Sequence, residues 1–136
     1  MTFDQFIPLG KILLAIILGS ILGWQRERWG KSAGPRTYAL VCGGATLFTI
    51  LSITAFAGNM AHVAAAIVSG IGFLGAGTII HKEGRVEGLT TAAGLWVVAA
   101  IGMAIGTNNY LIGIVTAALS LIVFMFDDRR WHKDKK

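Results

Sequence analysis

Two stretches of the sequence contain no Asp, Glu, Lys or Arg: TYALVCGGATLFTILSITAFAGNMAHVAAAIVSGIGFLGAGTII at residues 37–80 and GLTTAAGLWVVAAIGMAIGTNNYLIGIVTAALSLIVFMF at residues 88–126. They hold 44 and 39 residues. A helix needs about 20 consecutive apolar residues to cross a bilayer, so each stretch can form two crossings joined by a short turn. The sequence therefore predicts an integral membrane protein.

A further apolar stretch precedes these two and brings the expected number of spans to five. We expect spans at about residues 7–24, 37–57, 62–80, 91–106 and 109–126, within one transmembrane domain of residues 1–126 followed by a short basic tail at 127–136. The expected fold class is an all-α bundle of five transmembrane helices. The fourth span reaches only about 24 Å, so it needs local thinning of the bilayer or neighbouring protein, with a re-entrant segment as the alternative.

Eleven of the 12 basic residues lie in three of the segments outside these spans. They are Arg26, Arg28, Lys31 and Arg36 before the second span, Lys82 and Arg85 before the fourth, and Arg129, Arg130, Lys133, Lys135 and Lys136 in the tail. The positive-inside rule then puts the N-terminus outside and the C-terminus in the cytoplasm. The net charge of +5 is a membrane signature on this interpretation, and we expect no nucleic-acid partner.

The composition excludes several classes of protein. Only 14% of the residues are charged, against about 25% in an average soluble protein, which argues against a soluble enzyme. The single cysteine, Cys42, rules out a disulfide within the chain. No nucleophile stands beside a base, and no Cys/His cluster has metal-binding spacing, so we expect neither enzymatic activity nor a resident cofactor.

Carboxylates are absent between the expected membrane interfaces. Mg²⁺ prefers one or two carboxylates together with water, so a midplane magnesium site would have to use backbone carbonyls. The weak candidates for a metal site are peripheral: Glu27, Glu83 and Glu87. A role for magnesium, either as a ligand or as a signal, is left open.

The expected third span is unusually rich in small residues. Ser69, Gly70, Gly72, Gly75 and Gly77 fall within nine positions. Small residues let transmembrane helices approach closely, so we expect this span at the bundle centre. Two roles are open, tight packing alone or backbone carbonyls that line a pathway or hinge. Phe73 and Trp96 complete this set, and Gly19 with Gly23 and Gly102 with Gly106 show a similar spacing of small residues.

An internal duplication is also suggested by the sequence. A shift of 54 positions pairs Gly30 with Gly84 and Thr37 with Thr91, and it also matches basic residues in the two connections. The first two spans would then be a parallel relative of the third and fourth, with the fifth appended.

A second candidate site is a polar layer at the cytoplasmic face. It comprises Gln25, Arg26, Glu27, Arg36, Thr37, Glu87, Thr90 and Thr91. One interpretation is a solvated region whose basic residues hold lipid headgroups. The other is an ion-paired layer, for instance Arg36 with Glu27 or Glu87, that locks the helical hairpins together or receives a partner.

Three motifs carry a family resemblance: GKSAGPRTYALV at residues 30–41, IVSGIGFLGAG at 67–77 and GLTTAAGLW at 88–96. In this order and spacing the chain resembles the MgtC/SapB family of small bacterial inner-membrane proteins. The resemblance implies a multi-span protein linked to growth in low magnesium and, in some pathogens, to survival in macrophages. For the virulence members it also implies restraint of the F-type ATP synthase, and several members are treated as regulators rather than transporters.

The chain departs from the family pattern at four positions. The family usually has an acidic residue at Gln25 and often Leu at Pro35, and it commonly has Arg and Gln at His62 and Ala66. The change at Gln25 removes an expected partner of Arg26 or Arg36. The sequence ends ten residues after residue 126, so we expect it to lack the soluble C-terminal domain of longer members.

We therefore expect a modulator in the inner membrane. It would self-associate through small-residue faces, with a dimer favoured, and its cytoplasmic layer would bind another membrane complex such as the F-type ATP synthase or a transporter. One alternative is a channel or transporter for Mg²⁺ or another cation that uses the glycine-rich third span. Another is a structural membrane protein. All three have the lipid bilayer as a partner.

Overall fold

The structure is a computed structural model that describes residues 3–126. Within this range the elements are η1 (Phe3–Gln5), α1 (Phe6–Arg28), α2 (Pro35–Thr54), α3 (Met60–Gly77), β1 (Ile80–Lys82), β2 (Arg85–Glu87), α4 (Leu89–Gly106) and α5 (Tyr110–Met125). The first four α-helices are long and apolar enough to cross a membrane, and α5 is a shorter apolar helix of 16 residues. The five predicted helices are present, and the expected basic tail lies outside the described residues.

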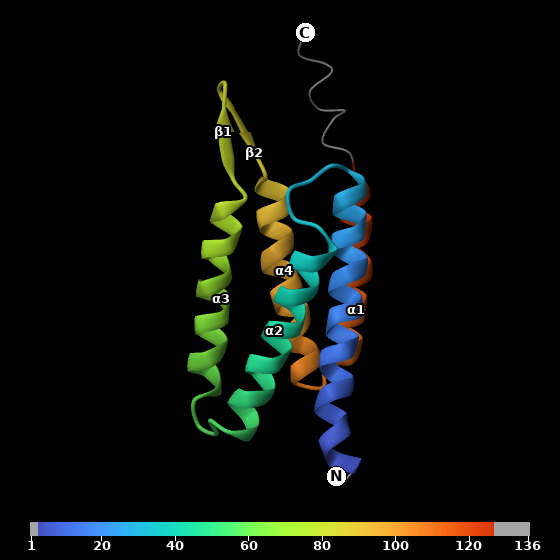
Figure 1. Cartoon of the computed structure of the whole chain (residues 1–136). Coiled ribbons are helices and arrows are strands. Elements are labelled where there is room, and N and C mark those ends of the chain that lie inside the picture. The colour runs from blue at the N-terminus through green and yellow to red at the C-terminus, as the bar shows by residue number, and fades with distance from the viewer. Residues whose placement is uncertain (1–2, 127–136) are drawn as a thin grey trace.

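Successive helices run in opposite directions, so the connections alternate between two ends of the bundle (Figure 1). The α1–α2 loop, the β1–β2 hairpin and the end of α5 lie at one end. The chain's first described residues and the α2–α3 and α4–α5 turns lie at the other. We name the first the basic end, because its connections carry Lys31, Lys82 and Arg85 while the turns at the other end carry no charged residue.

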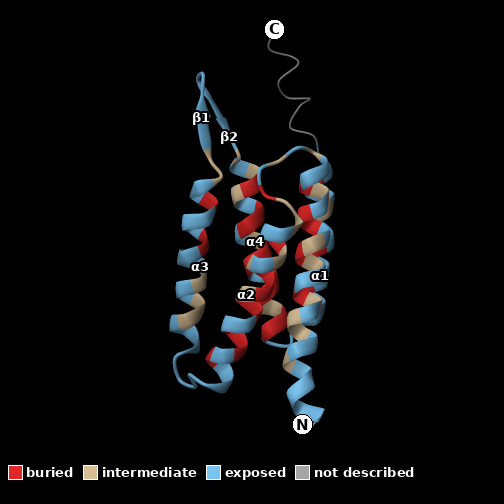
Figure 2. Cartoon of the chain, in the orientation of Figure 1, coloured by how far each residue is buried: buried red, intermediate tan, exposed pale blue. Residues whose placement is uncertain are grey.

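The central helix is α4, which packs against each of the other four helices. Half of its spanning window is buried, compared with 11% of the window in α3. Figure 2 shows most of α3 as exposed and the buried residues gathered on α1, α2 and α4. The expectation that the glycine-rich third span occupies the bundle centre is therefore wrong.

The close helix contacts are made at other glycines. A Cβ added to Gly19 of α1 would lie 2.5 Å from the backbone oxygen of Tyr38, and one added to Gly102 of α4 would collide with the backbone oxygen of Cys42. A Cβ on Gly72 of α3 would meet nothing within 4 Å. Small residues thus bring α1, α2 and α4 together, as such residues do in membranes, whereas Gly72 makes no close contact within residues 3–126.

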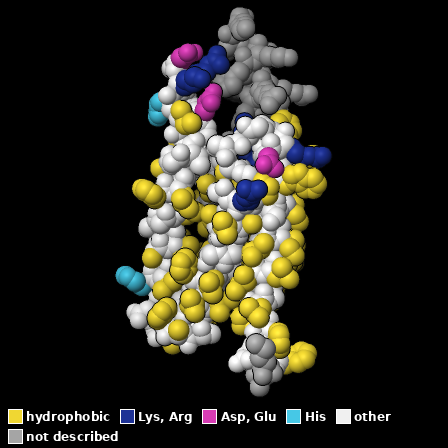
Figure 3. Space-filling model, in the orientation of Figure 1, with side chains coloured by type: hydrophobic (Ala, Val, Ile, Leu, Met, Phe, Trp, Pro, Cys, Tyr) yellow, Lys and Arg dark blue, Asp and Glu magenta, His cyan; other side chains and the backbone are white. Residues whose placement is uncertain are grey.

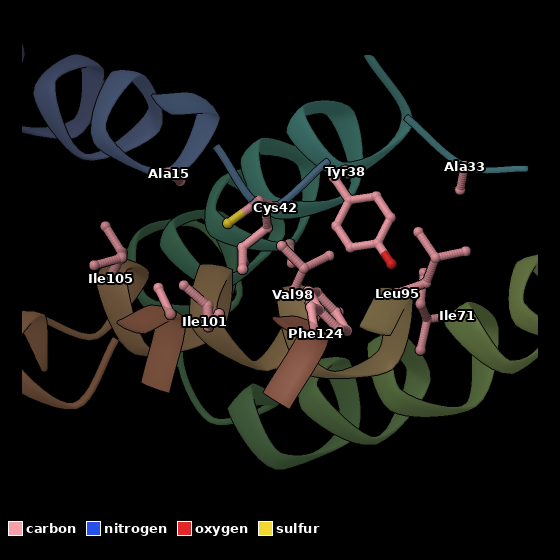
Figure 4. Close-up of a cluster of buried hydrophobic side chains, with 14 residues drawn as sticks. Ala15, Ala33, Tyr38, Cys42, Ile71, Leu95, Val98, Ile101, Ile105 and Phe124 are labelled. Carbon is pink, nitrogen blue, oxygen red and sulfur yellow. The ribbon is translucent and has the colours of Figure 1, made fainter. Parts of the chain in front are cut away.

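The side chains between these helices form one apolar core (Figure 4). Tyr38, Leu95 and Val98 are almost completely buried in it, and Cys42 lies in it as a free thiol. The ring of Phe124 from α5 packs edge-to-face against Tyr38, with centroids 6.4 Å apart. The core therefore ties α2 and α4 to the last turn of α5.

Several helix ends differ from the expected spans. α1 continues past residue 24 to Arg28, α3 ends at Gly77, and α4 begins at Leu89. As a result α4 has 18 residues and extends about 27 Å, and α5 rather than α4 is the shortest of the described α-helices.

The segment between α3 and α4 forms a β-hairpin, which an all-α fold does not include. β1 pairs antiparallel with β2, with Lys82 opposite Arg85. The turn residues Glu83 and Gly84 have φ of 48° and 75°, as a two-residue type I′ turn requires. The usual sequence signals for this turn are Asn-Gly and Asp-Gly. Glu83-Gly84 is not one of them, so the hairpin was not predicted.

The helix starts follow the offset of the suggested duplication. Pro35 and Leu89, the first residues of α2 and α4, are 54 positions apart. Gly30 and Gly84, which the same shift pairs, both have positive φ. The duplication itself stays a prediction.

Candidate functional site at the basic end

The extension of α1 to Arg28 places Gln25 and Arg26 on a helix rather than in a loop. Arg26 is only 3% exposed. Its Nη2 donates a hydrogen bond to Thr91 Oγ1 over 3.3 Å, and its guanidinium carbon lies 4.5 Å from the centre of the Phe124 ring. Its Nε is buried and has no hydrogen-bond partner among residues 3–126.

The neighbouring Gln25 uses only one of its two amide groups for a hydrogen bond in the described part of the chain. Its Nε2 donates to the backbone oxygen of Phe124 over 3.0 Å, whereas its Oε1 is buried and has no partner there. The hydroxyl of Tyr38 donates to the backbone oxygen of Thr91 over 3.3 Å. We refer to Gln25, Arg26, Tyr38, Thr91 and Phe124 as the Arg26 cluster. It joins α1, α2, α4 and α5 at the basic end.

The Arg26 cluster holds a positive charge that the described residues do not neutralise. Within residues 3–126, no carboxylate lies within 4.0 Å of the guanidinium. Thr91 is the third residue of α4, where the helix dipole disfavours a cation. Burial of an unpaired charge costs several kcal/mol, of which a desolvated cation–π contact offsets about 2 kcal/mol. Within residues 3–126, the polar and ring contacts of this cation therefore come from Thr91 and Phe124.

The other residues of the predicted layer lie around this cluster. Glu27, Arg36, Thr37 and Glu87 are exposed, and Thr90 is half-buried. Arg36 forms no ion pair with a carboxylate of the described range. The expected pairing of Arg36 with Glu27 or Glu87 is thus not made, and the layer divides into a buried cluster and an exposed charged rim.

The three weak metal candidates lie on different elements of the structure. Glu27 ends up on α1, Glu83 in the hairpin turn and Glu87 at the end of β2. In the described part of the chain, no group of three His, Cys, Asp or Glu side chains is placed to hold an ion.

The residues predicted to pack helices together or to line a pathway also differ in burial. Gly75 is buried, and a Cβ on it would lie 3.5 Å from the backbone oxygen of Ala92 in α4. Ser69, Gly70, Gly72, Phe73 and Gly77 are exposed on α3. Trp96 lines a cavity of about 220 Å³ between α3 and α4. Only Gly75 of the glycines in this set therefore contacts α4.

Polar groups inside the bundle are used for internal hydrogen bonds. Thr46 Oγ1 donates to backbone oxygens, with Gly102 O at 2.8 Å, and Thr49 Oγ1 donates to Ala45 O over 2.7 Å. Ser52 Oγ donates to the backbone oxygen of Thr49 over 2.7 Å. Such bonds are expected where water is absent, and they leave these hydroxyl protons engaged.

Sequence reasoning missed Tyr38 and Phe124. Phe124 is 99 positions from Gln25, which donates to its backbone, and no periodic pattern links such distant residues. The available signal was the position of Phe124 near the end of the last apolar stretch. This stretch ends on the same side of the membrane as the basic connections, so an aromatic ring and a cation can meet there.

Comparison with known proteins identifies the family. A family model described as "MgtC family" matches residues 12–131. The "Putative magnesium transporter YhiD" of Escherichia coli (strain K12) is 40% identical over 122 residues, which cover 83% of this chain and 57% of that protein. "Protein MgtC" of Salmonella typhimurium (strain LT2) is 44% identical over 99 residues, covering 73% and 43%.

A cyanobacterial relative is also similar. "Protein SrpB" of Synechococcus elongatus is 34% identical over 127 residues, covering 82% of this chain and 70% of that protein. The chain spans about half the length of several curated relatives, and no solved structure matches it. The match over most of the sequence, together with the apolar helices, shows that the chain is a multi-pass membrane protein that belongs to the MgtC family.

Proposed function

We propose that this protein is a non-enzymatic modulator of magnesium homeostasis that binds another complex of the bacterial inner membrane through its basic end. In this proposal the basic end faces the cytoplasm, since cytoplasmic loops carry an excess of Lys and Arg. The observation that supports the proposal is a difference between the charged side chains at the basic end and the hydroxyl groups inside the bundle. The charged side chains of Glu27, Arg36 and Glu87 are exposed and form no ion pairs within residues 3–126, whereas the interior hydroxyls donate to backbone oxygens.

The β1–β2 hairpin is the part of the basic end that would contact the partner. The β1–β2 hairpin extends beyond the helices (Figure 1), and Figure 3 shows charged side chains gathered over this end of the molecule. Lys82 lies directly opposite Arg85, and like charges in this position destabilise a strand pair. An acidic surface on a partner would relieve that repulsion, so we infer that the hairpin tip contacts carboxylates.

The Arg26 cluster supports the same partner chemistry. Its buried cation lies beside the start of α4 without a carboxylate from residues 3–126. We infer that the cluster fixes the relative positions of α1, α4 and α5, and that its positive potential strengthens binding of an acidic partner. Candidates of this kind include the F-type ATP synthase and a transporter, with Mg²⁺ acting as a signal.

The remaining glycine-rich surface favours self-association. Gly19 and Gly102 already meet α2 within the chain. The exposed residues Ala65, Ser69, Gly72 and Ala76 follow the spacing i, i+4, i+7, i+11 and therefore share one face of α3. We name this face the outer stripe of α3 and propose that it forms a dimer, as small residues do in membranes.

A second candidate function is cation transport, which one feature favours. α3 is the least buried of the four candidate spans, and cavities of about 490 and 220 Å³ lie between it and its neighbours α2 and α4. Movement of α3 could open a passage there. These cavities are lined almost wholly by apolar side chains, whereas Mg²⁺ keeps several waters and requires oxygen ligands, so we rank this function second. A structural role is third.

The experiment is genetic complementation combined with purification. A strain that lacks the gene and needs it for growth in low magnesium would receive the full chain with Lys82→Glu and Arg85→Glu together. We expect normal membrane levels but lost growth support and lost co-purification of the partner complex. Arg28→Glu, a charge reversal on exposed Arg28 of α1, is the matched control and should retain both. Full growth support by the double variant would contradict the proposal.

A further inference from the structure

An apolar groove lies on the membrane-facing side of the bundle between α2 and α3. Its volume is about 490 Å³, within the roughly 300–1,000 Å³ of pockets that hold small ligands. Leu40, Gly44 and Phe48 of α2 form one wall, Ala66 and Gly70 of α3 the other, and Ala99 of α4 lies at the floor. Figure 3 shows this face hollowed between α3 and α2. We refer to it as the α2–α3 groove.

Two glycines keep the groove open. A Cβ on Gly44 or on Gly70 would meet nothing within 4 Å, so neither glycine is needed for a close helix contact among the described residues. Larger residues would be tolerated there by the bundle and would also fill the groove. Gly44 and Gly70 therefore leave the groove open.

A basic side chain stands at one end of the groove. Arg36, Leu40, Gly44 and Phe48 are each four positions apart and so form one row along α2. Arg36 is exposed, belongs to the first turn of the spanning helix and has no ion pair among residues 3–126. A cation in this position reaches the headgroup layer of the leaflet at the basic end.

We infer that the α2–α3 groove binds one anionic phospholipid of that leaflet. One acyl chain lies along the row from Leu40 to Phe48, and the headgroup phosphate accepts charge-assisted hydrogen bonds from the Arg36 guanidinium. The apolar walls match the acyl chain, and the cation at the end of the row matches the phosphate. Leu40, a 74% exposed side chain between the two, is then covered by lipid.

The α2–α3 groove is not needed for contact with a second copy. The proposed dimer contact is the outer stripe of α3, which lies on another face of that helix.

The test is native mass spectrometry of the full chain released from nanodiscs that contain equal amounts of phosphatidylglycerol and phosphatidylcholine. We expect one retained phosphatidylglycerol per chain, at least fivefold preferred over phosphatidylcholine. Arg36→Gln should abolish this preference, because it removes the cation, and Gly44→Leu should reduce retention of both lipids by filling the groove. Arg28→Gln and Gly72→Leu are matched controls, since neither residue lines the groove, and both should retain the wild-type lipid.

Three results would overturn the inference. The first is that the wild-type chain retains no lipid, or retains both lipids equally. The second is that Arg36→Gln and Gly44→Leu behave like their controls. The third is that Gly44→Leu, rather than Gly72→Leu, converts a dimer to a monomer, which would show that the groove receives a second copy. A thermal unfolding measurement for each variant separates lost binding from lost folding.

Discussion

Arg26 Nη2 on α1 donates a hydrogen bond to Thr91 Oγ1 on α4 over 3.3 Å, although the two residues are 65 positions apart. This bond connects the end of the first helix to the start of the central helix. It also places a cation beside the N-terminus of α4, where the helix dipole opposes it. A stabilising contact and an unfavourable charge thus occur at the same position.

Loss of the acceptor should destabilise the bundle. Thr91→Val keeps the size of the side chain but removes the oxygen that accepts from Arg26. A hydrogen bond to a charged group contributes about 1.5–3 kcal/mol, so the free energy of unfolding should fall by about this amount. Thermal unfolding in detergent measures it. Thr107→Val, at an exposed hydroxyl bonded within its own helix turn, should change stability far less.

Loss of the charge should have a different effect. Arg26→Met replaces a buried cation by an apolar side chain of similar length, and such replacements of buried charges are often neutral or stabilising by about 1–4 kcal/mol. We expect unchanged or higher unfolding temperature together with lost growth support in low magnesium. Retained growth support would show that the charge has no role in partner binding.

The two substitutions should not be additive. In the Arg26→Met background Thr91→Val removes no hydrogen bond to a cation, so its cost should drop by at least about 1 kcal/mol. The double-mutant cycle from four unfolding curves gives this coupling. A coupling near zero would mean that the bond at 3.3 Å contributes nothing to stability.

Glycine substitutions should separate the bundle centre from its edge. Gly102→Ala forces a Cβ against the backbone oxygen of Cys42, and overpacking of this kind typically costs about 1–3 kcal/mol. Gly72→Ala meets open space and replaces glycine in a helix, so it should be neutral or stabilising by up to about 1 kcal/mol. Equal unfolding temperatures for the two variants would contradict a bundle centred on α4.

A contact at the opposite end offers another test. Lys11 Nζ on α1 donates to the backbone oxygen of Gly106, the last residue of α4, over 3.2 Å. A cation at a helix C-terminus adds about 0.3–1 kcal/mol beyond the hydrogen bond. Lys11→Met should therefore lower the free energy of unfolding by about 1–2 kcal/mol. An unchanged unfolding temperature would show that Lys11 is solvated instead.

The sequence was sufficient to predict the helices because bilayer thickness sets how long an apolar segment must be. Basic residues also predicted that the α1–α2 loop and the 80–87 connection share one end, as Figure 1 shows. The ends of the helices were harder to predict. Gln25 and Arg26 look like the start of a loop by polarity alone, yet they continue α1 because their side chains reach α4 and α5.

The arrangement of the helices could not be predicted from composition. Glycine content placed the third span at the centre, but a glycine marks a close contact only where another backbone approaches it, as Cys42 approaches Gly102. The same content on an outer helix leaves an exposed face. The Arg26 cluster was predicted only in part, since Gln25, Arg26 and Thr91 were named for the polar layer whereas Tyr38 and Phe124 join it through tertiary packing.

The most direct test of the central claim is Mg²⁺ uptake by proteoliposomes that contain the purified full chain, with empty vesicles and a Gly75→Leu variant as controls. A modulator predicts uptake equal to that of empty vesicles, with insertion and orientation verified by protease accessibility of the β1–β2 hairpin. Saturable uptake that depends on the protein, and that a folded Gly75→Leu variant loses, would contradict the proposal and assign the pathway to α3.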